Sequence, residues 1–329
     1  MVVVCLFACS KEVEITLPLP EKRIVVNSFF CPDSIWTIYV SSNGSIKNNH
    51  GVAAMPPIED AKVEIWEGSH FVGELQHKGS GKYILPVYPQ KGKTYTVKVS
   101  AKDYPNVEAT DRIPTHSPTA ISGSIDWKHS QVVNEIGSTY DVFPTQFVFQ
   151  DSIGGNNYYY LKGYYYDSCN TLWGGNVVLL NHLYPKRWGY RFIPNDVIID
   201  PISKEIQEIL FQDKQIDGDS YSLNLQITKG NSGFNDIQFT CIQPEDGTTE
   251  PIGYGLNPPE ENYLEMYIEL QNVSEAMYYF IRSYHLQAKN FPDPFATYNN
   301  AYSNVKGGRG IFCGYSGHKV LVFQGKIGF

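Results

Sequence analysis

Apolar and polar residues alternate in short runs through the first third of the chain. Residues 35–40, 61–66 and 93–99 each place apolar side chains at about every second position, which is the pattern of a half-buried β-strand. Turn-forming Gly, Asn and Ser residues separate such runs, as at residues 41–44. About six or seven short strands between residues 23 and 113 predict an immunoglobulin-like or transthyretin-like β-sandwich.

The proline-containing stretch from Pro105 to Pro118 predicts a linker. A second, larger antiparallel β domain is expected over residues 114–329. The sequence Phe-Gln-Asp occurs in it at residues 149–151 and again at 211–213. Each copy precedes a turn rich in Gly, Asn or Asp and then a further strand, an order typical of a β-hairpin. We therefore expect two hairpins in this domain.

One segment follows a helical period instead. Between residues 274 and 288, apolar residues recur at the spacing of one helix face: Met277, Phe280, Ile281 and Tyr284. Asn272 followed by Glu275 suggests a capping box at its start. This amphipathic helix is expected to pack on the sheet, because its outer face lacks the basic run of a membrane-surface helix. The predicted fold class is mainly β, with an N-terminal sandwich and a larger antiparallel domain that carries one helix.

Composition supports strands and excludes one class of partner. The 24 tyrosines, 28 glycines and 20 prolines favour pleated sheets and turns. A formal net charge of −8, with no stripe of Lys and Arg, provides no positive field for phosphates. Nucleic acid is therefore not an expected partner.

The N-terminus resembles a lipoprotein signal. Residues 6–9, Leu-Phe-Ala-Cys, are similar to a lipobox, in which a small residue precedes the cleavage site and the following Cys thiol takes the lipid. Phe7 is bulkier than usual at its position. The apolar run is far shorter than the ~20 residues that a spanning helix needs. We predict lipidation at Cys9 and a signal remnant over residues 1–9.

The polar residues that follow predict where the anchored protein is displayed. Residues 10–22 are expected to be a linker, and their acidic start, Glu12 and Glu14, resembles the signal for the outer face in lipoproteins of the Bacteroidota type. Cys5 is a poorer lipid acceptor than Cys9, because the bulky Val4 precedes it. The expected location is the outer membrane, with a lipid anchor and a body exposed at the cell surface.

The four remaining cysteines are far apart: Cys31, Cys169, Cys241 and Cys313. No C-x-x-C pair occurs, so neither a zinc knuckle nor a thioredoxin-like site is expected. Two disulfides with three connectivities and buried free thiols are both compatible with this pattern.

The order of these features resembles the "domain of unknown function 4249" family of Bacteroidota outer-membrane lipoproteins. A lipobox, the Ala-Lys-Val strand at residues 61–63, the two Phe-Gln-Asp segments, the helix, and a Gly-rich stretch with Ile-Phe at 304–312 follow in sequence. The chain departs from the family pattern after Ile-Phe, where Cys313 stands before Gly314. The resemblance implies a lipoprotein beside a TonB-dependent receptor that imports nutrients, and it supplies no catalytic residues.

The sequence predicts no catalytic centre, metal site or cofactor. H-E-x-x-H does not occur, and the Ser at residue 316 lacks the G-x-S-x-G spacing between a strand and a helix. The Gly-rich run at 307–310 lacks the Lys-Ser/Thr of a phosphate loop, although Arg309 could hold an anion. Residues 213–219 offer Asp oxygens for calcium, but their spacing is not that of a calcium loop, and a turn is the favoured interpretation.

A candidate ligand platform lies in the Tyr-rich run at 158–166. In a strand, one face would carry a tyrosine ladder broken by a single cation: Tyr158, Tyr160, Lys162, Tyr164 and Tyr166. Tyr159, Leu161 and Tyr165 share the other face, which Leu161 marks as the core face. The ladder could stack on a glycan or a peptide. The favoured alternative is that the tyrosines form cross-strand pairs that stabilise the sheet.

These features together predict a non-enzymatic cell-surface lipoprotein that assists nutrient capture as an accessory to a TonB-dependent receptor. The membrane, through its lipid, and that receptor are the expected partners. Two alternatives are a structural or adhesive surface protein and an extracytoplasmic hydrolase of unrecognised type. Convergent carboxylates or histidines in a pocket would favour the hydrolase.

Overall fold

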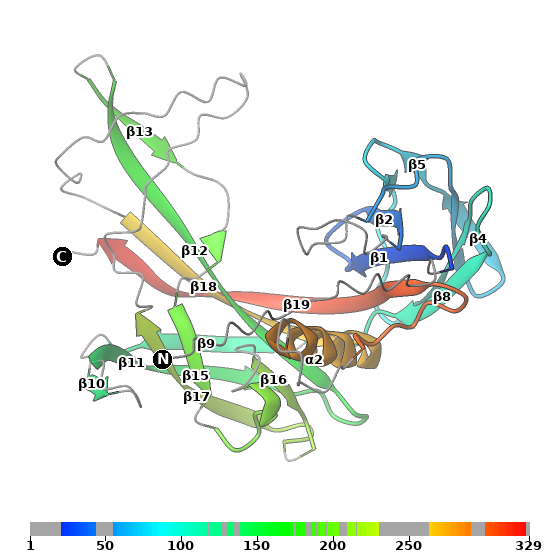
Figure 1. Cartoon of the computed structure of the whole chain (residues 1–329). Helices are drawn as coiled ribbons and strands as arrows, with labels where there is room; N and C mark the ends of the chain where they lie inside the picture. Colours follow the sequence, from blue (N-terminus) through cyan, green and yellow to red (C-terminus); the bar gives the residue numbers. More distant parts are fainter. Residues whose placement is uncertain are drawn as a thin grey trace, which may run out of the picture.

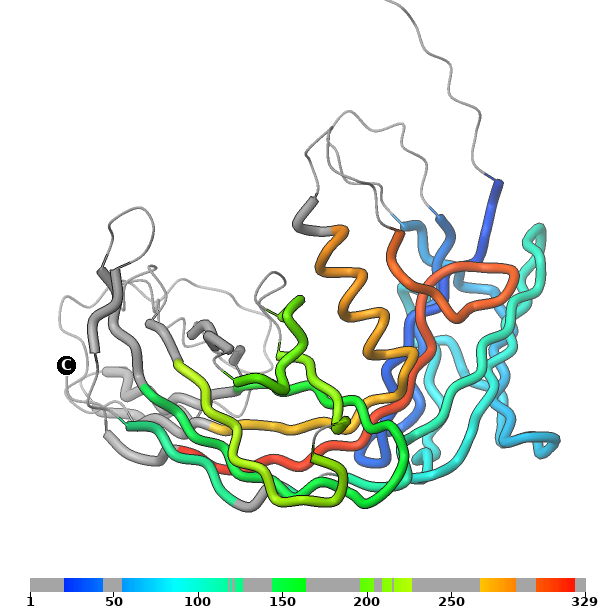
Figure 2. The backbone as a smooth tube through the Cα atoms, turned by 90° about the horizontal axis from the view of Figure 1, so that it is seen from below, coloured from blue at the N-terminus to red at the C-terminus, as the bar shows by residue number. Residues whose placement is uncertain are grey.

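A computed structural model describes residues 21–43, 55–117, 119–126, 130–133, 139–173, 176–181, 186–187, 190–194, 196–203, 209–214, 216–229, 263–290 and 300–326. These residues form three β-sheets and the helix α2 (Glu275–Asn290). Figure 1 shows the sandwich at one end of the molecule and the larger β domain at the other, joined by the long strand β19 (Arg309–Lys326). The tube view in Figure 2 shows α2 standing between these two parts.

The N-terminal part is a sandwich of two sheets. One layer has the order β1-β2-β6-β5, and the other has the order β4-β3-β7-β8. Buried Trp36 and Tyr83 from the first layer pack against Val63 and Val97 from the second. The strands are β1 (Ile24–Phe30), β2 (Trp36–Ser42), β3 (Lys62–Glu67), β4 (His70–Glu74), β5 (Gln76–His77), β6 (Lys82–Leu85), β7 (Thr94–Ser100) and β8 (Val107–Arg112).

A strand from the C-terminal end of the chain completes this sandwich. β19 runs parallel to β1, with Val26 opposite Gly310 and Phe30 opposite Gly314. Phe312 points into the sandwich core, where its ring lies 4.5 Å from that of Phe30. Residues 23–113 therefore share their core with residues far along the sequence, and the sandwich and the larger domain are parts of one continuous sheet.

The larger domain is a second layered structure. Strands β13, β12, β18 and β19 continue the long sheet, with β14 and β16 paired to β12, and a five-stranded sheet of β10, β11, β17, β15 and β9 faces it. Aromatic and aliphatic side chains of both sheets fill the space between them, including Phe147, Phe149 and Ile268. The strands are β9 (Thr119–Ile125), β10 (Ser130–Val133), β11 (Thr139–Gln150), β12 (Tyr158–Trp173), β13 (Asn176–Asn181), β14 (Lys186–Arg187), β15 (Tyr190–Pro194), β16 (Ile209–Gln212), β17 (Ser220–Lys229) and β18 (Tyr263–Val273).

Helix α2 covers the opposite face of the long sheet. Met277, Tyr278 and Ile281 are buried against Ile311 and Cys313 of β19. The helix lies where the sequence predicted it, but its N-terminal cap differs from the expected one. Ser274 is the N-cap, because its Oγ accepts a hydrogen bond from the backbone N–H of Met277 at 3.2 Å. Position 277, three residues after Ser274, holds a Met, whose side chain cannot accept a hydrogen bond from the backbone N–H of Ser274. The helix therefore has an N-cap but no capping box.

The two Phe-Gln-Asp segments are not hairpins. The first, at the end of β11, leads from the five-stranded sheet into β12 of the long sheet, and the second leads from β16 of the long sheet into β17 of the five-stranded sheet. We call residues 151–157 and 213–219 the twin turns. The turn-forming residues predicted that the chain reverses direction at each site. They did not show that the strands before and after each turn belong to different sheets. The twin turns therefore close the same edge of the layered domain.

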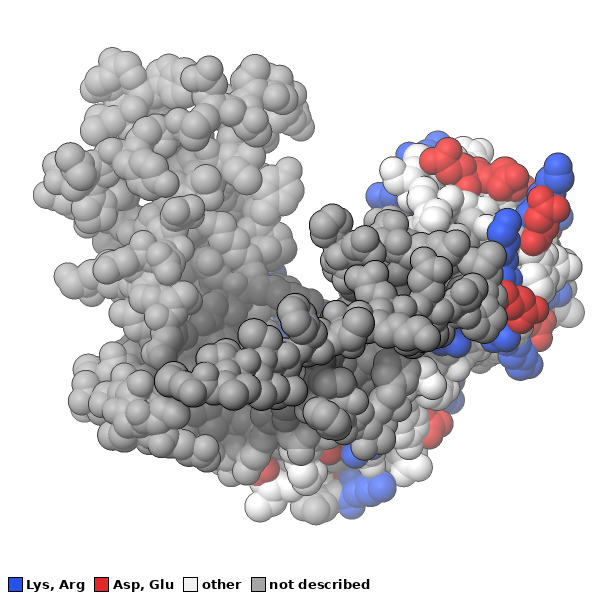
Figure 3. All heavy atoms as spheres, in the orientation of Figure 1, with Lys and Arg blue, Asp and Glu red and all other residues white. Residues whose placement is uncertain are grey.

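The predicted fold class is confirmed as mainly β, with several antiparallel sheets and a helix at the expected place. Cys31 and Cys313 are buried free thiols, which decides the open question for these two. The side chains of Cys169 and Cys241 lie outside the described part of the chain. Lys, Arg, Asp and Glu side chains lie intermixed over the coloured part of the sandwich in Figure 3. Exposed pairs such as Lys93 with Glu67 contribute little to stability, so the core holds the sandwich together.

Candidate ligand-binding site

A pocket of about 480 Å³ lies where the sandwich meets the larger domain. Its volume is within the range of small-molecule sites, about 300–1,000 Å³. Four separate segments line it: the start of β7, the end of β8, the turn before β12, and the junction of β18 with α2. We call this the junction pocket. Its lining residues are Thr94, Asp111, Arg112, Pro114, Asn156, Asn157, Tyr158, Asn272, Val273, Ser274 and Glu275.

Paired polar side chains form one part of this lining. The carboxylate of Asp111 accepts a hydrogen bond from the backbone N–H of Gly314 at 3.0 Å. Asn272 is buried, and its Nδ2 donates to the carbonyl oxygen of His116 at 3.1 Å and to Oδ1 of Asn157 at 3.2 Å. These bonds tie β8, β18, β19 and the first twin turn together. The pocket wall is thus held by bonds that satisfy its buried polar groups.

Other lining residues keep their polar atoms available. Within the described part of the chain, the side chains of Arg112 and Asn156 form no hydrogen bond with the protein, although the charge of Arg112 lowers the pKa of the neighbouring Asp111 carboxyl. Glu275 is exposed and accepts one bond at Oε1, from the hydroxyl of Tyr158 at 3.2 Å. Burial, followed by the nearby charge of Glu275, raises the pKa of Tyr158 to about 12, so its hydroxyl stays protonated and donates.

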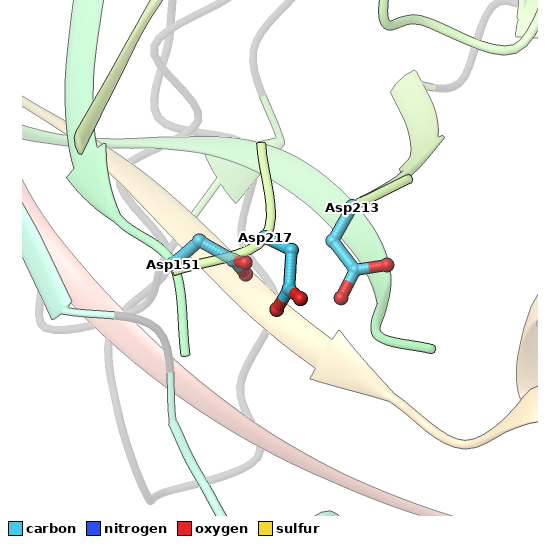
Figure 4. A group of neighbouring side chains, drawn as sticks. All are labelled: Asp151, Asp213 and Asp217. Carbon is cyan, nitrogen blue, oxygen red and sulfur yellow. The ribbon is translucent and has the colours of Figure 1, made fainter. Parts of the chain in front are cut away.

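A cluster of three carboxylates lies next to the pocket, in the twin turns. Asp151, Asp213 and Asp217 each offer one oxygen within 4.8 Å of the others, as Figure 4 shows. Asp151 accepts bonds from the hydroxyl of Tyr159 and from the backbone N–H of Gly218. Burial and the charges of the other two carboxylates raise the pKa of Asp213, although two bonds from Asn157 oppose that rise.

The bonds of this cluster run from each twin turn to the other. Asp151 in the first turn accepts from Gly218 in the second, while Asp213 in the second accepts from Asn157 in the first, at 2.9 Å from its backbone N–H. Such reciprocal bonds join the two corners of the domain. Three aspartates could also provide oxygens for a divalent cation. An acidic cluster whose oxygens already bind protein donors does not by itself define a metal site, and its clear role is structural.

Helix α2 covers the start of the predicted tyrosine platform. Tyr160 is only 5% exposed and packs under the helix, and Tyr158 is half-buried with its ring 4.9 Å from that of Tyr278. Lys162 places its ammonium over the Tyr160 ring, at 4.8 Å. The open ladder expected from the sequence is therefore wrong at Tyr160, whereas Tyr158 remains partly exposed and lines the junction pocket. The side chains of Tyr164 and Tyr166 lie outside the described part of the chain, and so does the predicted lipidation site at Cys9.

The opposite face of β12 is buried, as expected from its alternation. Tyr159 and Leu161 are 0% and 2% exposed and face the five-stranded sheet. Among the ladder residues whose side chains the structure describes, only Tyr158 contributes to the junction pocket. The rest of the pocket was missed from the sequence, because Arg112, Asn156 and Glu275 lie in unrelated segments and form no motif. In the sequence, the adjacent residues Asn156 and Asn157 indicate only a turn.

The sequence profile of the family described as "Domain of unknown function (DUF4249)" matches residues 10–319, which is nearly the whole chain. The chain belongs to this family. No curated protein matches this DUF4249 member.

Two solved structures similar to this DUF4249 member are domains of biofilm-associated proteins. The BSP domain is 9% identical with a TM-score of 0.21, and the match covers 92% of this chain and 59% of the other. The B domain is 8% identical with a TM-score of 0.18, and the match covers 91% and 85% of the two chains. This DUF4249 chain thus spans less than two thirds of the first structure. No described helix combines the length and the apolar character that a membrane span requires.

The buried carboxyl of Asp111 is expected to make the free energy of unfolding depend on pH. Burial raises its pKa from 3.8 to about 6, so the folded protein binds a proton more tightly than the unfolded chain does. The free energy of unfolding should therefore fall as the pH rises from about 4 to about 6. The pKa change corresponds to about 3 kcal/mol. Urea denaturation at several pH values should show the Asp111→Asn variant gaining about this much relative to the wild type across that window. A constant difference would contradict a raised pKa.

Proposed function

We propose that this protein is a non-enzymatic surface lipoprotein that captures a small ligand for a TonB-dependent outer-membrane receptor. The observation that carries the capture role is the junction pocket, in which four segments of the chain place polar side chains around a space of about 480 Å³. Pockets of this kind, between two parts of a protein, are common places for ligands. The Leu-Phe-Ala-Cys signal ending at Cys9 supports the anchor, and the acidic Glu12 and Glu14 support the outer face.

The membership in the DUF4249 family supports the same proposal through what the sequence resemblance implies, namely lipoproteins of Bacteroidota that accompany nutrient importers. A lipid on Cys9 would hold the body close to a receptor in the same membrane. A tether of about a dozen residues then keeps the effective concentration of the pocket near the receptor high. Capture at the surface and transfer to the importer would follow from this proximity.

The anchor and the partner are tested together in cells that produce the full chain. Metabolic labelling with an alkyne fatty acid should label the wild type and the Cys5→Ser variant, and not the Cys9→Ser variant. When the full chain is purified from detergent-solubilised outer membranes, a TonB-dependent receptor should co-purify with the wild type and be depleted for Cys9→Ser. Labelling that persists in Cys9→Ser would contradict the anchor. Purification without any such receptor would contradict the accessory role.

One observation favours a hydrolase as the second candidate. Two carboxyl groups, from Asp111 and Glu275, line the same pocket, and the pKa of Asp111 is raised by burial to about 6. A carboxyl that is partly protonated near neutral pH can act as a general acid beside an ionised carboxylate. Turnover of an oligosaccharide by the purified chain, abolished in both Asp111→Asn and Glu275→Gln, would establish this candidate and contradict the non-enzymatic proposal.

A further inference from the structure

We infer that the junction pocket binds a neutral, hydroxyl-rich ligand, namely one or two units of a short carbohydrate. This inference rests on the proposed capture function and names the chemical class of what is captured. The residues that would contact it are Arg112, Asn156, Glu275 and Tyr158. They come from the sandwich, from the first twin turn, from the helix and from the first residue of β12.

The charges at the pocket argue against an ionic ligand. A phosphate or an acidic sugar would meet the guanidinium of Arg112, but also the carboxylates of Asp111 and Glu275 in the same lining. A cationic ligand would meet the two carboxylates together with that guanidinium. The two carboxylates and one guanidinium give the lining a formal net charge of −1, so an anion is disfavoured, while the guanidinium weakens the attraction for a cation. A neutral ligand with polar groups suits this distribution.

Hydroxyl groups match the hydrogen-bonding capacity that is left over. A sugar hydroxyl donates one hydrogen bond and accepts others, so it pairs best with a site that offers both kinds of atom. The free amide of Asn156 provides a donor and an acceptor, Arg112 provides donors, and the second oxygen of Glu275 provides an acceptor. A bidentate guanidinium or carboxylate can bind two neighbouring hydroxyls of one ring. No hydrogen bond within the described part of the protein has to be broken before these atoms bind a ligand.

Tyr158 provides the apolar surface that sugar rings require. Its hydroxyl is fixed by Glu275 at 3.2 Å, and its ring lies 4.9 Å from that of Tyr278 and 6.4 Å from that of Tyr279. A ring held from two sides loses little conformational entropy when a ligand binds against it. Tyrosine combines an apolar ring with a polar tip, which suits a ligand with both C–H and O–H groups.

The lining does not suit an apolar side chain of a peptide. Pro114, Val273 and Tyr158 are its apolar members, and polar residues surround them. Extended peptides are generally recognised by an added strand at a sheet edge or by apolar pockets for alternate side chains. The pocket is instead lined by a turn, a helix start and the ends of two neighbouring strands. A peptide is therefore the competing outcome in the experiment below.

The test measures binding of the detergent-solubilised full chain to defined ligands by isothermal titration calorimetry. The ligands are malto-, cello-, xylo- and manno-oligosaccharides of two to six units, with oligogalacturonate as the acidic arm and a mixture of synthetic tri- to pentapeptides as the peptide arm. We expect at least one neutral series to bind. Arg112→Ala and Asn156→Ala should each weaken that binding about tenfold, the effect of one lost polar contact. Neither side chain makes a hydrogen bond to the described part of the protein, and Arg112 acts on Asp111 through its charge, so the fold should be retained.

Matched substitutions outside the pocket serve as controls. Arg309→Ala removes an exposed arginine, and Asn300→Ala removes an exposed asparagine, and neither residue lines the pocket. Both should bind the same oligosaccharide within twofold of the wild type. Far-UV circular dichroism of all four variants should match that of the wild type.

The outcomes separate this inference from the proposed function. Oligosaccharide binding that is unchanged in Arg112→Ala and Asn156→Ala overturns the pocket as the sugar site. Pocket-dependent binding of a peptide or of oligogalacturonate overturns the ligand class and leaves capture intact. If no oligosaccharide binds at all, the inference is overturned, whereas the labelling of Cys9 and the co-purification of a receptor still decide the proposed function independently.

Discussion

The Phe312→Ala variant is expected to lose about 3–5 kcal/mol of the free energy of unfolding, the usual cost of deleting a buried phenylalanine ring. Phe312 is 0% exposed, and its ring lies 4.5 Å from that of Phe30 and stacks on Trp36 at 6.0 Å. The loss should exceed the effect of most single substitutions, because the cavity would lie between the two layers of the sandwich. Urea denaturation followed by far-UV circular dichroism measures it.

A second substitution of a large apolar residue by alanine on the same strand provides the control. Leu321 also belongs to β19 but is 40% exposed, so Leu321→Ala should cost less than about 1 kcal/mol. If Phe312→Ala and Leu321→Ala cost the same small amount, the C-terminal strand does not contribute to the sandwich core. A large loss for Phe312→Ala alone would show that the N-terminal sandwich depends on residues near the end of the chain.

The alternation of residues was sufficient to predict the sandwich strands but not the strand that completes them. Trp36, Ile38 and Val40 alternate with more exposed residues, and all three are buried as this period requires. The parallel pairing of β1 with β19 joins Val26 to Gly310, and no local signal announces a partner so far along the chain. Long-range pairing is decided by which buried faces fit together, which a single sequence does not show.

The twin turns illustrate the same limit at shorter range. The repeated Phe-Gln-Asp was visible in the sequence, and both aromatic residues proved to be buried, with the rings of Phe149 and Phe211 5.6 Å apart. Turn residues fix how the chain reverses direction, while the sheet that receives each strand depends on its neighbours. The expected hairpins were wrong for this reason, although the turns themselves lie where they were predicted.

The candidate site was the part that sequence could predict least. The period of β12 correctly assigned Tyr159 to the core face. A period of two cannot show that the distant helix α2, which begins at Glu275, covers Tyr160 on the other face. The junction pocket likewise depends on the packing of four segments. Arg112 and Asn156 look like ordinary surface residues in the sequence, and only their position opposite the start of α2 makes them candidates.

The largest backbone effect is expected for Gly310→Ala, at the point where β19 lies against β1. Gly310 has a φ of +103°, which L side chains rarely adopt, and a Cβ there would lie 2.0 Å from the carbonyl oxygen of Val26. The unfavourable φ alone costs about 1–3 kcal/mol. Because the obstructing atom belongs to the backbone of the neighbouring strand, relief of the clash requires the two strands to separate. The loss in the free energy of unfolding should therefore exceed that range.

Gly79→Ala separates the two causes. Gly79 has a similar φ of +98°, but a Cβ at this position meets nothing within 4 Å. This variant should show only the conformational cost of about 1–3 kcal/mol, whereas Gly310→Ala should lose more and should expose the amides of β1 to hydrogen exchange. Equal losses for the two variants would mean that the close approach at Val26 contributes nothing. A greater loss for Gly310→Ala shows that the parallel contact holds the sandwich and the larger domain in one sheet, and thereby fixes the two walls of the junction pocket.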